Sequence, residues 1–302
     1  MFSFLLLSLY VGIIMWAKPS DKVSQHQWQD NLIKAQDFIY DTGKVSENII
    51  VGSSLSCRFV MDSLNDFRNL AFNGQSVFEG MNILGQSEKL PKNVFIEMNV
   101  IVRGENRGFT GVLFNPLVYW MRKTFPPLRD GNQPLARAGQ PVSFAVRGLI
   151  KELKSHLVFK KAEAKVSLAS TVTVMGGFRK ADPVQKNDLL TRLVNMQVKN
   201  YSTVADPKLL ENRLDELDRY IAPLKKRGIN IIFFEMPVNS KLPNLPGAVA
   251  IRESFHRRFP ANEYRYILQP DCSSYETSDG LHLDDLEAVR YTVYFRDQAG
   301  KR

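Results

Sequence analysis

Two short stretches of the chain carry the residues that could do chemistry. In the first, Ser53 and Ser54 directly follow Gly52. In the second, Asp279 lies three residues before His282, with a glycine in the intervening turn. A serine hydroxyl needs a neighbouring base, because its own pKa is far above neutrality. A carboxylate that reaches an imidazole across a turn fixes its tautomer and leaves Nε2 facing a nucleophile. These residue types together are suited to nucleophilic catalysis by an activated serine.

Each stretch also has a simpler interpretation. Ser53 or Ser54 can serve only as the N-cap of a following helix, since serine is a favoured capping residue. Asp279 can likewise cap the last helix while His282 only packs. Taken alone, the serine stretch favours the capping interpretation, and the Asp279–His282 stretch favours neither. The other histidines lie on a predicted helix or among basic residues, where surface or packing roles are expected: His26, His156 and His256.

The elements around these residues predict a parallel sheet. Short apolar runs that end in small polar residues are typical of buried parallel strands, and here they alternate with helical patterns as in βαβ units. Predicted strands cover Ile49–Val51, Asn69–Phe72, Asn93–Met98, Asn230–Met236 and Tyr264–Leu268. Predicted helices cover Asp21–Thr42, Cys57–Asn65, Val77–Leu84, Pro207–Arg227 and Asp285–Phe295. We therefore predict an α/β fold, a flavodoxin-like three-layer sandwich with a central parallel sheet.

The N-terminus predicts a membrane anchor. Residues Phe2–Ala17 form an uncharged, largely apolar run, slightly shorter than the usual helical span of a bilayer. We interpret residues 1–20 as an N-terminal signal anchor or transmembrane segment; a cleaved signal peptide and a buried helix are the alternatives. Cleavage after Ala17 would place Met15 where a small residue is preferred. Lys18 and Lys22 follow the run, which by the positive-inside rule favours a cytoplasmic body.

The rest of the chain divides into a linking helix, residues 21–44, and one large domain, residues 45–302. The segment between the third and fourth strands is far longer than one crossover helix requires, so we predict a large helical insertion at about residues 104–200. It contains an aromatic piece, Gly108–Pro127, and a basic amphipathic stretch, Phe144–Lys165. A lid or membrane-facing element is one interpretation. We favour a helical subdomain that borders the site.

Composition narrows the classes of partner. The 302 residues carry a net charge of +9, with 44% hydrophobic and 24% charged residues, which suits an anionic partner. Nucleic acid is the least favoured, because the sequence has no zinc-finger spacing, aromatic RNA-binding motif or dense basic block. Two cysteines, Cys57 and Cys272, exclude a disulfide scaffold and a cysteine-rich metal site, and they could form one bridge or remain thiols. No metal or cofactor is predicted.

The order of the polar residues along the sheet strengthens the chemical interpretation. Ser54 follows the first strand, Gly74 the second, Asn99 the third, and the Asp279–His282 pair the last. In an open parallel α/β sheet, the carboxyl ends of the strands share one edge, where such folds bind ligands. We therefore expect these residues to meet at that edge.

This combination resembles the SGNH hydrolase superfamily, the GDSL-type esterases and acyltransferases. Its blocks are matched in order by Gly52-Ser53-Ser54-Leu55-Ser56, by Gly74 within Asn73-Gly74-Gln75-Ser76, by Asn99 after Glu97-Met98, and by Asp279-Gly280-Leu281-His282. The resemblance covers roughly Val45–Phe295 apart from the insertion. Two departures are Ser53 in place of the motif's aspartate, and Glu97-Met98-Asn99-Val100 in place of Gly-x-Asn-Asp.

The resemblance implies a role for each matched residue. Ser54 would be the nucleophile, His282 its general base and Asp279 the orienting carboxylate. The oxyanion hole would use the backbone N–H groups of Ser54 and Gly74 and the side-chain amide of Asn99. Each preorganised donor of this kind is worth on the order of 3 kcal/mol in the transition state.

The overall layout looks like that of membrane-anchored SGNH proteins that O-acetylate cell-surface polysaccharides, such as the alginate O-acetylation proteins, and like the D-alanylation protein of teichoic acid synthesis. It implies an O-acetyltransferase or O-acetylesterase acting on an envelope or exported polysaccharide through an acyl-serine, with a membrane-bound O-acyltransferase as partner. The domain of residues 45–302 would then be periplasmic and anchored to the inner membrane. This conflicts with the positive-inside rule, which favours a cytoplasmic domain. The alternative is a non-catalytic SGNH-fold scaffold in an envelope polysaccharide assembly.

Overall fold

A computed structural model describes residues 2–17, 26–41, 43, 46–87, 90–133 and 183–301. The chain divides into two compact units. The larger contains Lys34–Val118 and Pro183–Arg302, and the smaller contains Met1–Ile33 and Tyr119–Asp182. The residues predicted as triad and oxyanion hole all belong to the larger unit. The basic stretch Phe144–Lys165, predicted within the insertion, lies outside the described residues.

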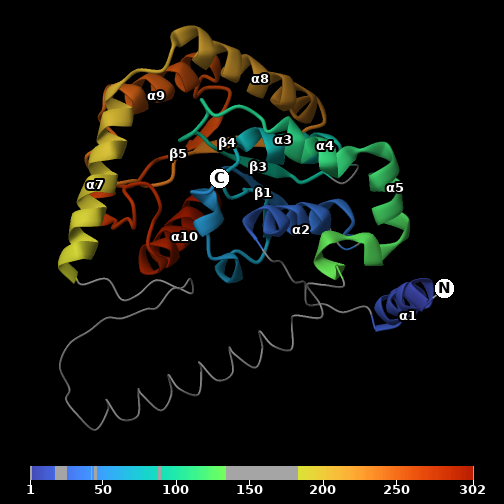
Figure 1. The fold of residues 1–302 in the computed structure, drawn as a ribbon. Coiled ribbons are helices and arrows are strands. Elements are labelled where there is room, and N and C mark those ends of the chain that lie inside the picture. The colour runs from blue at the N-terminus through green and yellow to red at the C-terminus, as the bar shows by residue number, and fades with distance from the viewer. Residues whose placement is uncertain are drawn as a thin grey trace. The chain divides into compact units, whose positions relative to one another are not determined.

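The larger unit is built on a five-stranded sheet in which every pair of neighbouring strands is parallel (Figure 1). The strands are β1 (Asn48–Val51), β2 (Phe67–Asn69), β3 (Asn93–Glu97), β4 (Asn230–Phe234) and β5 (Arg265–Ile267). Their spatial order is β2-β1-β3-β4-β5. The chain therefore moves to one side of β1 for β2 and to the other side for β3. Such a switch point opens a crevice at the carboxyl ends of β1 and β3. The predicted α/β fold with a parallel sheet is confirmed.

The described part of the chain also contains helices. They are α1 (Phe2–Ala17), α2 (Gln27–Ile39), α3 (Val77–Gly85), α4 (Arg107–Phe114), α5 (Pro116–Thr124), α7 (Pro183–Ser202), α8 (Pro207–Lys226), α9 (Pro246–Arg258) and α10 (Asp285–Ala299). Local sequence explains the starts of two of them. Ser76 and Glu79 form a reciprocal capping box on α3, which satisfies free N–H groups of the first turn. Asp206 caps α8, and Pro207 occupies its first turn, where a missing N–H costs nothing.

Both faces of the sheet are covered by aromatic side chains. On one face, Phe295 of α10 lies against Phe95 and Phe234, at ring-centroid distances of 5.3 and 5.1 Å. On the other face, Phe233 contacts Phe255 of α9 at 5.3 Å. Burying each of these rings contributes roughly 1.5–3 kcal/mol. The alternation of Phe233 and Phe234 to opposite faces thus fixes the register of β4 between two helical layers.

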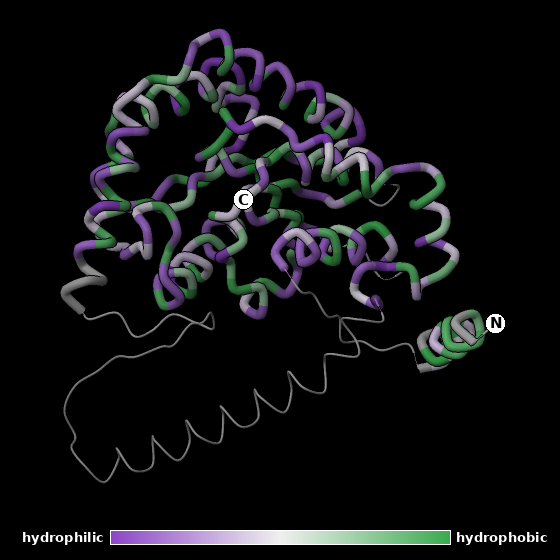
Figure 2. Tube along the Cα trace, viewed as in Figure 1, coloured by the Kyte–Doolittle hydropathy of each residue, from purple (hydrophilic) through white to green (hydrophobic). Residues whose placement is uncertain are grey.

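The N-terminal helix α1 occupies the predicted apolar run, and Figure 2 shows it as hydrophobic along nearly its whole length. Its side chains include Phe4 at 75% and Trp16 at 87% exposure. Within the described residues, no helix is both long enough and apolar enough to span a bilayer. The anchor role of residues 1–20 is therefore without support from the structure and stays a prediction.

Two local predictions in the larger unit are wrong. The helix expected at Cys57–Asn65 is replaced by two short 3₁₀ turns, η1 (Ser56–Arg58) and η2 (Met61–Ser63). Tertiary bonds hold this segment open, among them Val60 N–H to the Thr292 hydroxyl at 3.1 Å. The strand expected at Asn69–Phe72 is instead β2, which ends where that prediction began. The following apolar residues are buried, but their backbone leaves the sheet after Leu70 N–H bonds to Ile50 at 2.7 Å.

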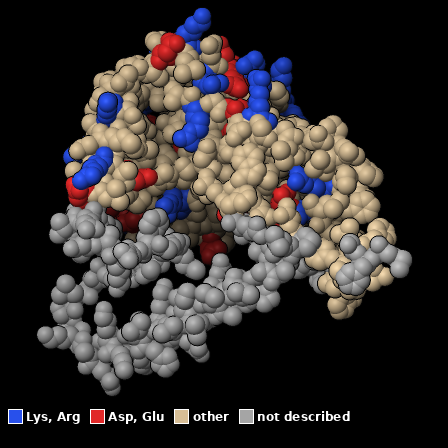
Figure 3. Space-filling view, viewed as in Figure 1, with Lys and Arg blue, Asp and Glu red and all other residues tan. Residues whose placement is uncertain are grey.

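Charges on the larger unit are mixed rather than gathered into one basic tract on the face seen in Figure 3. Arg258 of α9, for example, contacts Asp215 and Asp218 of α8 at 3.1 and 2.7 Å. Exposed pairs of this kind contribute little to stability. Much of the basic excess belongs to residues 134–182, which have nine Lys and Arg against three Asp and Glu and lie outside the described residues. The visible face thus lacks the basic stripe typical of nucleic-acid binding.

Candidate active site

The serine turn, Gly52–Ser56, leaves the carboxyl end of β1 and is held by a buried carboxylate at the end of β3. Glu97 is fully buried and accepts four hydrogen bonds from the turn. Ser53 donates its backbone N–H at 2.9 Å and its hydroxyl at 2.7 Å. Ser56 does the same at 3.2 and 2.5 Å. Because β1 and β3 are paired neighbours, Glu97 fixes the turn relative to the sheet itself.

Gly52 makes this close approach possible. A Cβ atom at this position would lie 2.5 Å from the Ser56 hydroxyl and 2.6 Å from Glu97 Oε2. Both distances are below the contact limit for a carbon atom, and both atoms are fixed by hydrogen bonds. The glycine is therefore required by the packing of the turn on Glu97, at a residue whose own φ is not positive.

Three side chains from the two candidate stretches form one hydrogen-bonded chain. The Ser54 hydroxyl lies 2.9 Å from His282 Nε2. On the other side of the ring, His282 Nδ1 lies 2.7 Å from Asp279 Oδ2. The structure thus brings together the three residues predicted as nucleophile, base and orienting carboxylate. His282 and Asp279 keep 25% and 34% of their side-chain surface exposed, so a substrate can reach the group.

Asp279 is held in its orientation by the backbone of its own loop. Its Oδ1 accepts the N–H groups of Leu281 at 2.9 Å and His282 at 2.8 Å. Partial burial alone would raise the pKa of this carboxyl, but the hydrogen bonds from the His282 ring and the two backbone N–H groups outweigh it and hold the pKa far below its usual range. Asp279 is therefore ionised when it faces the imidazole, as stabilisation of a protonated ring requires.

No family model and no curated protein matches this chain. The interpretation of the site therefore depends on geometry and on the residue types that supply it.

The loop that carries Asp279 and His282 is fastened from two directions. Asn239, after β4, donates its backbone N–H to Gly280 at 2.9 Å. Gly280 has a φ of +94°, and a Cβ there would lie 3.4 Å from Val194 of α7. A larger residue would be strained at this φ and pressed against the helix. Helix α7, which belongs largely to the predicted insertion, thus lies against Gly280 in the loop that carries Asp279 and His282.

Two of the three predicted oxyanion donors are backbone groups. Among the described residues, neither Ser54 N–H nor Gly74 N–H is used in a hydrogen bond with another group of the chain. Gly74 has a φ of +74° and sits in the turn that follows the end of β2. Since β2 pairs with β1, both donors belong to the same edge of the sheet.

The third predicted donor, Asn99, is tied to the neighbouring strand. Its Nδ2 donates to the Met236 carbonyl at 3.0 Å, and its Oδ1 accepts the Met236 N–H at 2.8 Å. This pair of bonds clamps the ends of β3 and β4 together. One proton of the amide is used in this way, and a primary amide has a second.

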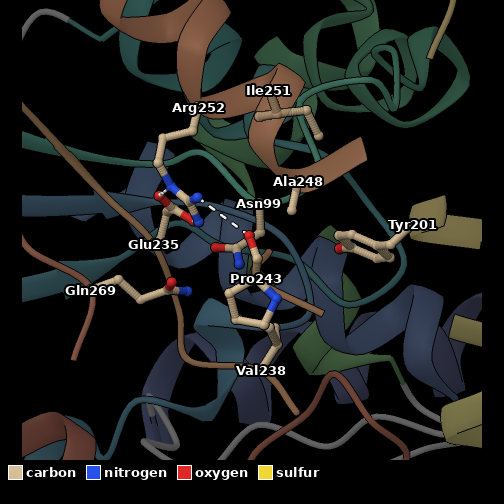
Figure 4. A pocket seen from close by; sticks show the side chains of 9 residues that line it. All are labelled: Asn99, Tyr201, Glu235, Val238, Pro243, Ala248, Ile251, Arg252 and Gln269. Carbon is tan, nitrogen blue, oxygen red and sulfur yellow. Dashed lines mark hydrogen bonds and ion pairs between the residues drawn. The ribbon is translucent and has the colours of Figure 1, made fainter. Parts of the chain in front are cut away.

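Asn99 also lines a pocket over the carboxyl ends of β3, β4 and β5 (Figure 4). The pocket is shallow, and most of the space of about 280 Å³ around it is open to solvent. Its lining residues come from the strand ends and from helices α7 and α9: Asn99, Tyr201, Glu235, Val238, Pro243, Ala248, Ile251, Arg252 and Gln269.

Several functional features were missed by sequence reasoning. Glu97 was noted only as a departure from the family pattern, although a charged residue between Ile96 and Met98 at the end of a buried strand is itself a signal. Tyr201 and Arg252 carried no signal.

The thiols of Cys57 and Cys272 are free, and burial raises the pKa of Cys57 to about 11. Among the described residues, no group of three or more His, Cys, Asp or Glu is placed to hold a metal ion.

Proposed function

We propose that this protein is a serine-dependent acyl-transfer enzyme that works through an acyl-Ser54 intermediate. The observation that carries the proposal is the unbroken chain from the Ser54 hydroxyl through His282 to Asp279. Each residue type matches its role, and the order of the two contacts on the imidazole is the one that nucleophile activation requires.

The chemistry follows from these contacts. Ser54 Oγ attacks the carbonyl carbon of an ester while its proton moves to His282 Nε2. Asp279 stabilises the resulting imidazolium through Nδ1. The negative carbonyl oxygen is stabilised by hydrogen bonds from the N–H groups of Ser54 and Gly74 and from the second amide proton of Asn99. As the tetrahedral intermediate collapses, the C–O bond to the alcohol breaks and His282 returns the proton to the leaving oxygen. Water or a sugar hydroxyl then takes the acyl group by the same steps in reverse.

The finer assignment follows the resemblance stated above. The strand order, the helical cover of both sheet faces and the position of the triad support an SGNH-type three-layer sandwich. By analogy of layout, the substrate is an envelope or exported polysaccharide, the acyl group is acetyl, and the partner is a membrane-bound O-acyltransferase. The body would lie outside the cytoplasm, attached to the inner membrane by residues 1–20.

A fluorophosphonate probe tests the central proposal, because it reacts covalently only with an activated serine. We expect the wild type to be labelled at Ser54, with labelling lost in Ser54→Ala and His282→Ala. Ser240→Ala, which removes an exposed serine, is the matched control and should be labelled like the wild type. Equal labelling of Ser54→Ala, or none of the wild type, would refute the assignment. Intact-mass detection of acetyl-Ser54 after incubation with an activated acetyl ester would establish the intermediate.

One observation favours a second candidate, a non-catalytic scaffold with the same fold. The side chain of Asn99 already bonds to Met236 in both directions, as a structural residue would. This candidate requires that Ser54→Ala and His282→Ala leave polysaccharide acylation in cells unchanged. Loss of acylation in either variant, with normal protein levels, would remove it.

A further inference from the structure

The two backbone donors of the proposed oxyanion hole come from different strands. Ser54 follows β1, and Gly74 follows β2 within a second turn, Asn73–Ser76, here named the glycine turn. Near the ends of these strands, Leu70 donates its N–H to the Ile50 carbonyl at 2.7 Å, and each donor lies four residues beyond that bond. An oxyanion needs its donors at about 2.7–3.1 Å from one oxygen. Contacts beyond the paired strands must therefore set the separation of the two turns.

The shape of each turn is fixed by a buried carboxylate. Glu97 holds the serine turn, as described above. At the glycine turn, Glu79 of α3 is fully buried and accepts the backbone N–H of Ser76 at 2.8 Å and its hydroxyl at 2.6 Å. Arg103 donates from Nη1 to the Gln75 carbonyl at 3.0 Å. These bonds run to β3, to the loop after it and to α3, and none of them joins the two turns directly.

The side chain of Asn69, the last residue of β2, makes a direct connection. Asn69 is only 7% exposed. Its Nδ2 donates to the carbonyl of Ser56, at the end of the serine turn, at 2.7 Å. Its Oδ1 accepts the N–H of Ala71 at 2.8 Å, within the segment that leads to Gly74. One amide group is therefore bonded both to the serine turn and to the segment that carries the second donor.

A partly buried lysine fixes the direction of this amide. Lys34 of α2 donates from Nζ to the Ala71 carbonyl at 2.6 Å and to Asn69 Oδ1 at 3.4 Å. Its ammonium lies 5.6 Å from the centre of the Phe72 ring. An ammonium group has donors but no acceptor, so the amide atom that faces it must be the oxygen. The NH₂ group of Asn69 is thereby left to face the Ser56 carbonyl.

We infer that Asn69 is a positioning residue of the oxyanion hole, whose amide sets the separation between the N–H groups of Ser54 and Gly74. The inference rests on the proposed function and adds to it a residue that the sequence pattern did not single out. Asn69 acts through the backbone of Ser56 and Ala71. Loss of its Nδ2 donor should therefore slow the chemical step and leave substrate binding unchanged.

One substitution removes the donor and keeps the acceptor. In Asn69→Asp the carboxylate can still accept hydrogen bonds but cannot donate one to the Ser56 carbonyl. Asn93→Asp is the matched control at the opposite, amino edge of the sheet. There Asn93 donates to Asn48 at 2.7 Å and accepts from Asn230 at 2.9 Å, so the same exchange removes the same kind of bond between neighbouring strands.

Two measurements separate positioning from structural damage. With 4-nitrophenyl acetate, Asn69→Asp should lower kcat about 10²-fold, as expected for a catalytic group displaced by about 1 Å, and change KM less than about twofold. The second measurement is inhibition by an alkyl trifluoromethyl ketone. Its carbonyl carbon bonds to Ser54 Oγ, the serine proton passes to His282, no group leaves, and the ketone oxygen becomes the oxyanion.

The inhibition constant of the ketone should rise by about the same factor as kcat falls, because the adduct resembles the transition state. A variant that only folds poorly would lower the apparent kcat, but the inhibition constant of its folded fraction would stay at the wild-type value. Asn93→Asp should match the wild type in both measurements.

A second variant keeps the test decisive if Asn69→Asp folds poorly. Lys34→Met frees the Asn69 amide to turn, and should produce the same pair of changes at about tenfold, the usual worth of one hydrogen bond to a charged group. Lys92→Met, at a lysine whose side chain is 70% exposed, should change neither value.

The outcomes distinguish the positioning role from the proposed function. A wild-type inhibition constant in both Asn69→Asp and Lys34→Met, or an equal rise in Asn93→Asp, would overturn the positioning role while Ser54 chemistry stands. A wild-type protein that neither hydrolyses the ester nor binds the ketone would refute the proposed function, and the positioning role with it.

Discussion

Glu97 ends β3 and Glu235 directly follows β4, so both lie at the carboxyl edge of the sheet. Their carboxylates have different hydrogen-bond partners. Glu97 is fully buried, and its four hydrogen bonds come from two serines. Glu235 is partly exposed and pairs with a guanidinium. The first carboxylate acts as a fixed template for the serine turn, and the second cancels a charge within the pocket. Changes at Glu97 should therefore lower stability more than changes at Glu235.

The largest effect is expected from the carboxylate that orients the triad. Asp279→Asn should lower kcat/KM for a small acetyl ester by about 10⁴-fold, because the amide can hold the wrong tautomer of His282 while the geometry stays intact. Steady-state kinetics measures this. Asp271→Asn is the control, since Asp271 also caps a short turn, η5 (Cys272–Ser274), through side-chain bonds but takes no part in the site. A loss below tenfold would separate Asp279 from the chemistry.

Replacing each of the two glutamates by alanine tests the comparison directly. Glu97→Ala leaves four buried donors of the serine turn without partners, and should lower the free energy of unfolding by about 3 kcal/mol or more. Glu235→Ala should cost about 1 kcal/mol, because the pair is partly exposed and Arg252 can turn to water. Urea denaturation measures both. Equal losses would mean that the two carboxylates have the same structural role.

Gly52→Ala sharpens the comparison at the scale of one methyl group. The added carbon would press on Ser56 and Glu97, so we expect a loss of about 1–3 kcal/mol in the free energy of unfolding. Gly111→Ala in α4 is the matched control, because a Cβ there meets nothing within 4 Å and alanine favours a helix. The melting temperature should lie below that of the wild type for Gly52→Ala and above it for Gly111→Ala. A wild-type melting temperature for Gly52→Ala would show that the turn is looser than its contacts imply.

The smallest effect is a dependence on pH. The folded-state pKa of Asp279 lies below its unfolded value of 3.8, so its stabilising contribution is complete above about pH 4 and is lost as the pH falls towards the folded value. The amide that Asp279→Asn introduces cannot titrate. The difference in stability between wild type and variant should therefore shrink on acidification below pH 4, as followed by urea midpoints. A difference that stays constant would assign the low pKa to another group.

Much of the fold was predictable because its signals are local. Apolar runs define β1, β3 and β4, and a strong 3.6-residue period with an N-terminal proline defines α8. Helix α9 was missed because only Gly247 and Phe255 in it are fully buried, which leaves almost no period to recognise. The 3₁₀ turns after Ser54 were missed because their geometry is set by tertiary bonds, which outweigh local propensity.

The residues of the candidate site were likewise predictable only in part. The triad could be predicted because strand order alone brings the carboxyl ends of a parallel sheet together. The role of Glu97 could not, since its hydrogen-bond partners lie 41 and 44 residues away along the chain. The pocket could not either, because Tyr201 and Arg252 reach it from helices whose positions no motif specifies.

The contact between Ser54 and His282 joins residues 228 positions apart. During synthesis, β1, β3 and Glu97 emerge long before the loop that carries the base, so the serine turn can be complete while its hydroxyl remains unactivated. Under the proposed function, Ser54 is therefore activated only after that loop has been synthesised and has brought His282 to the serine hydroxyl. A chain that ends before Asp279 would therefore lack the base that the proposed mechanism requires.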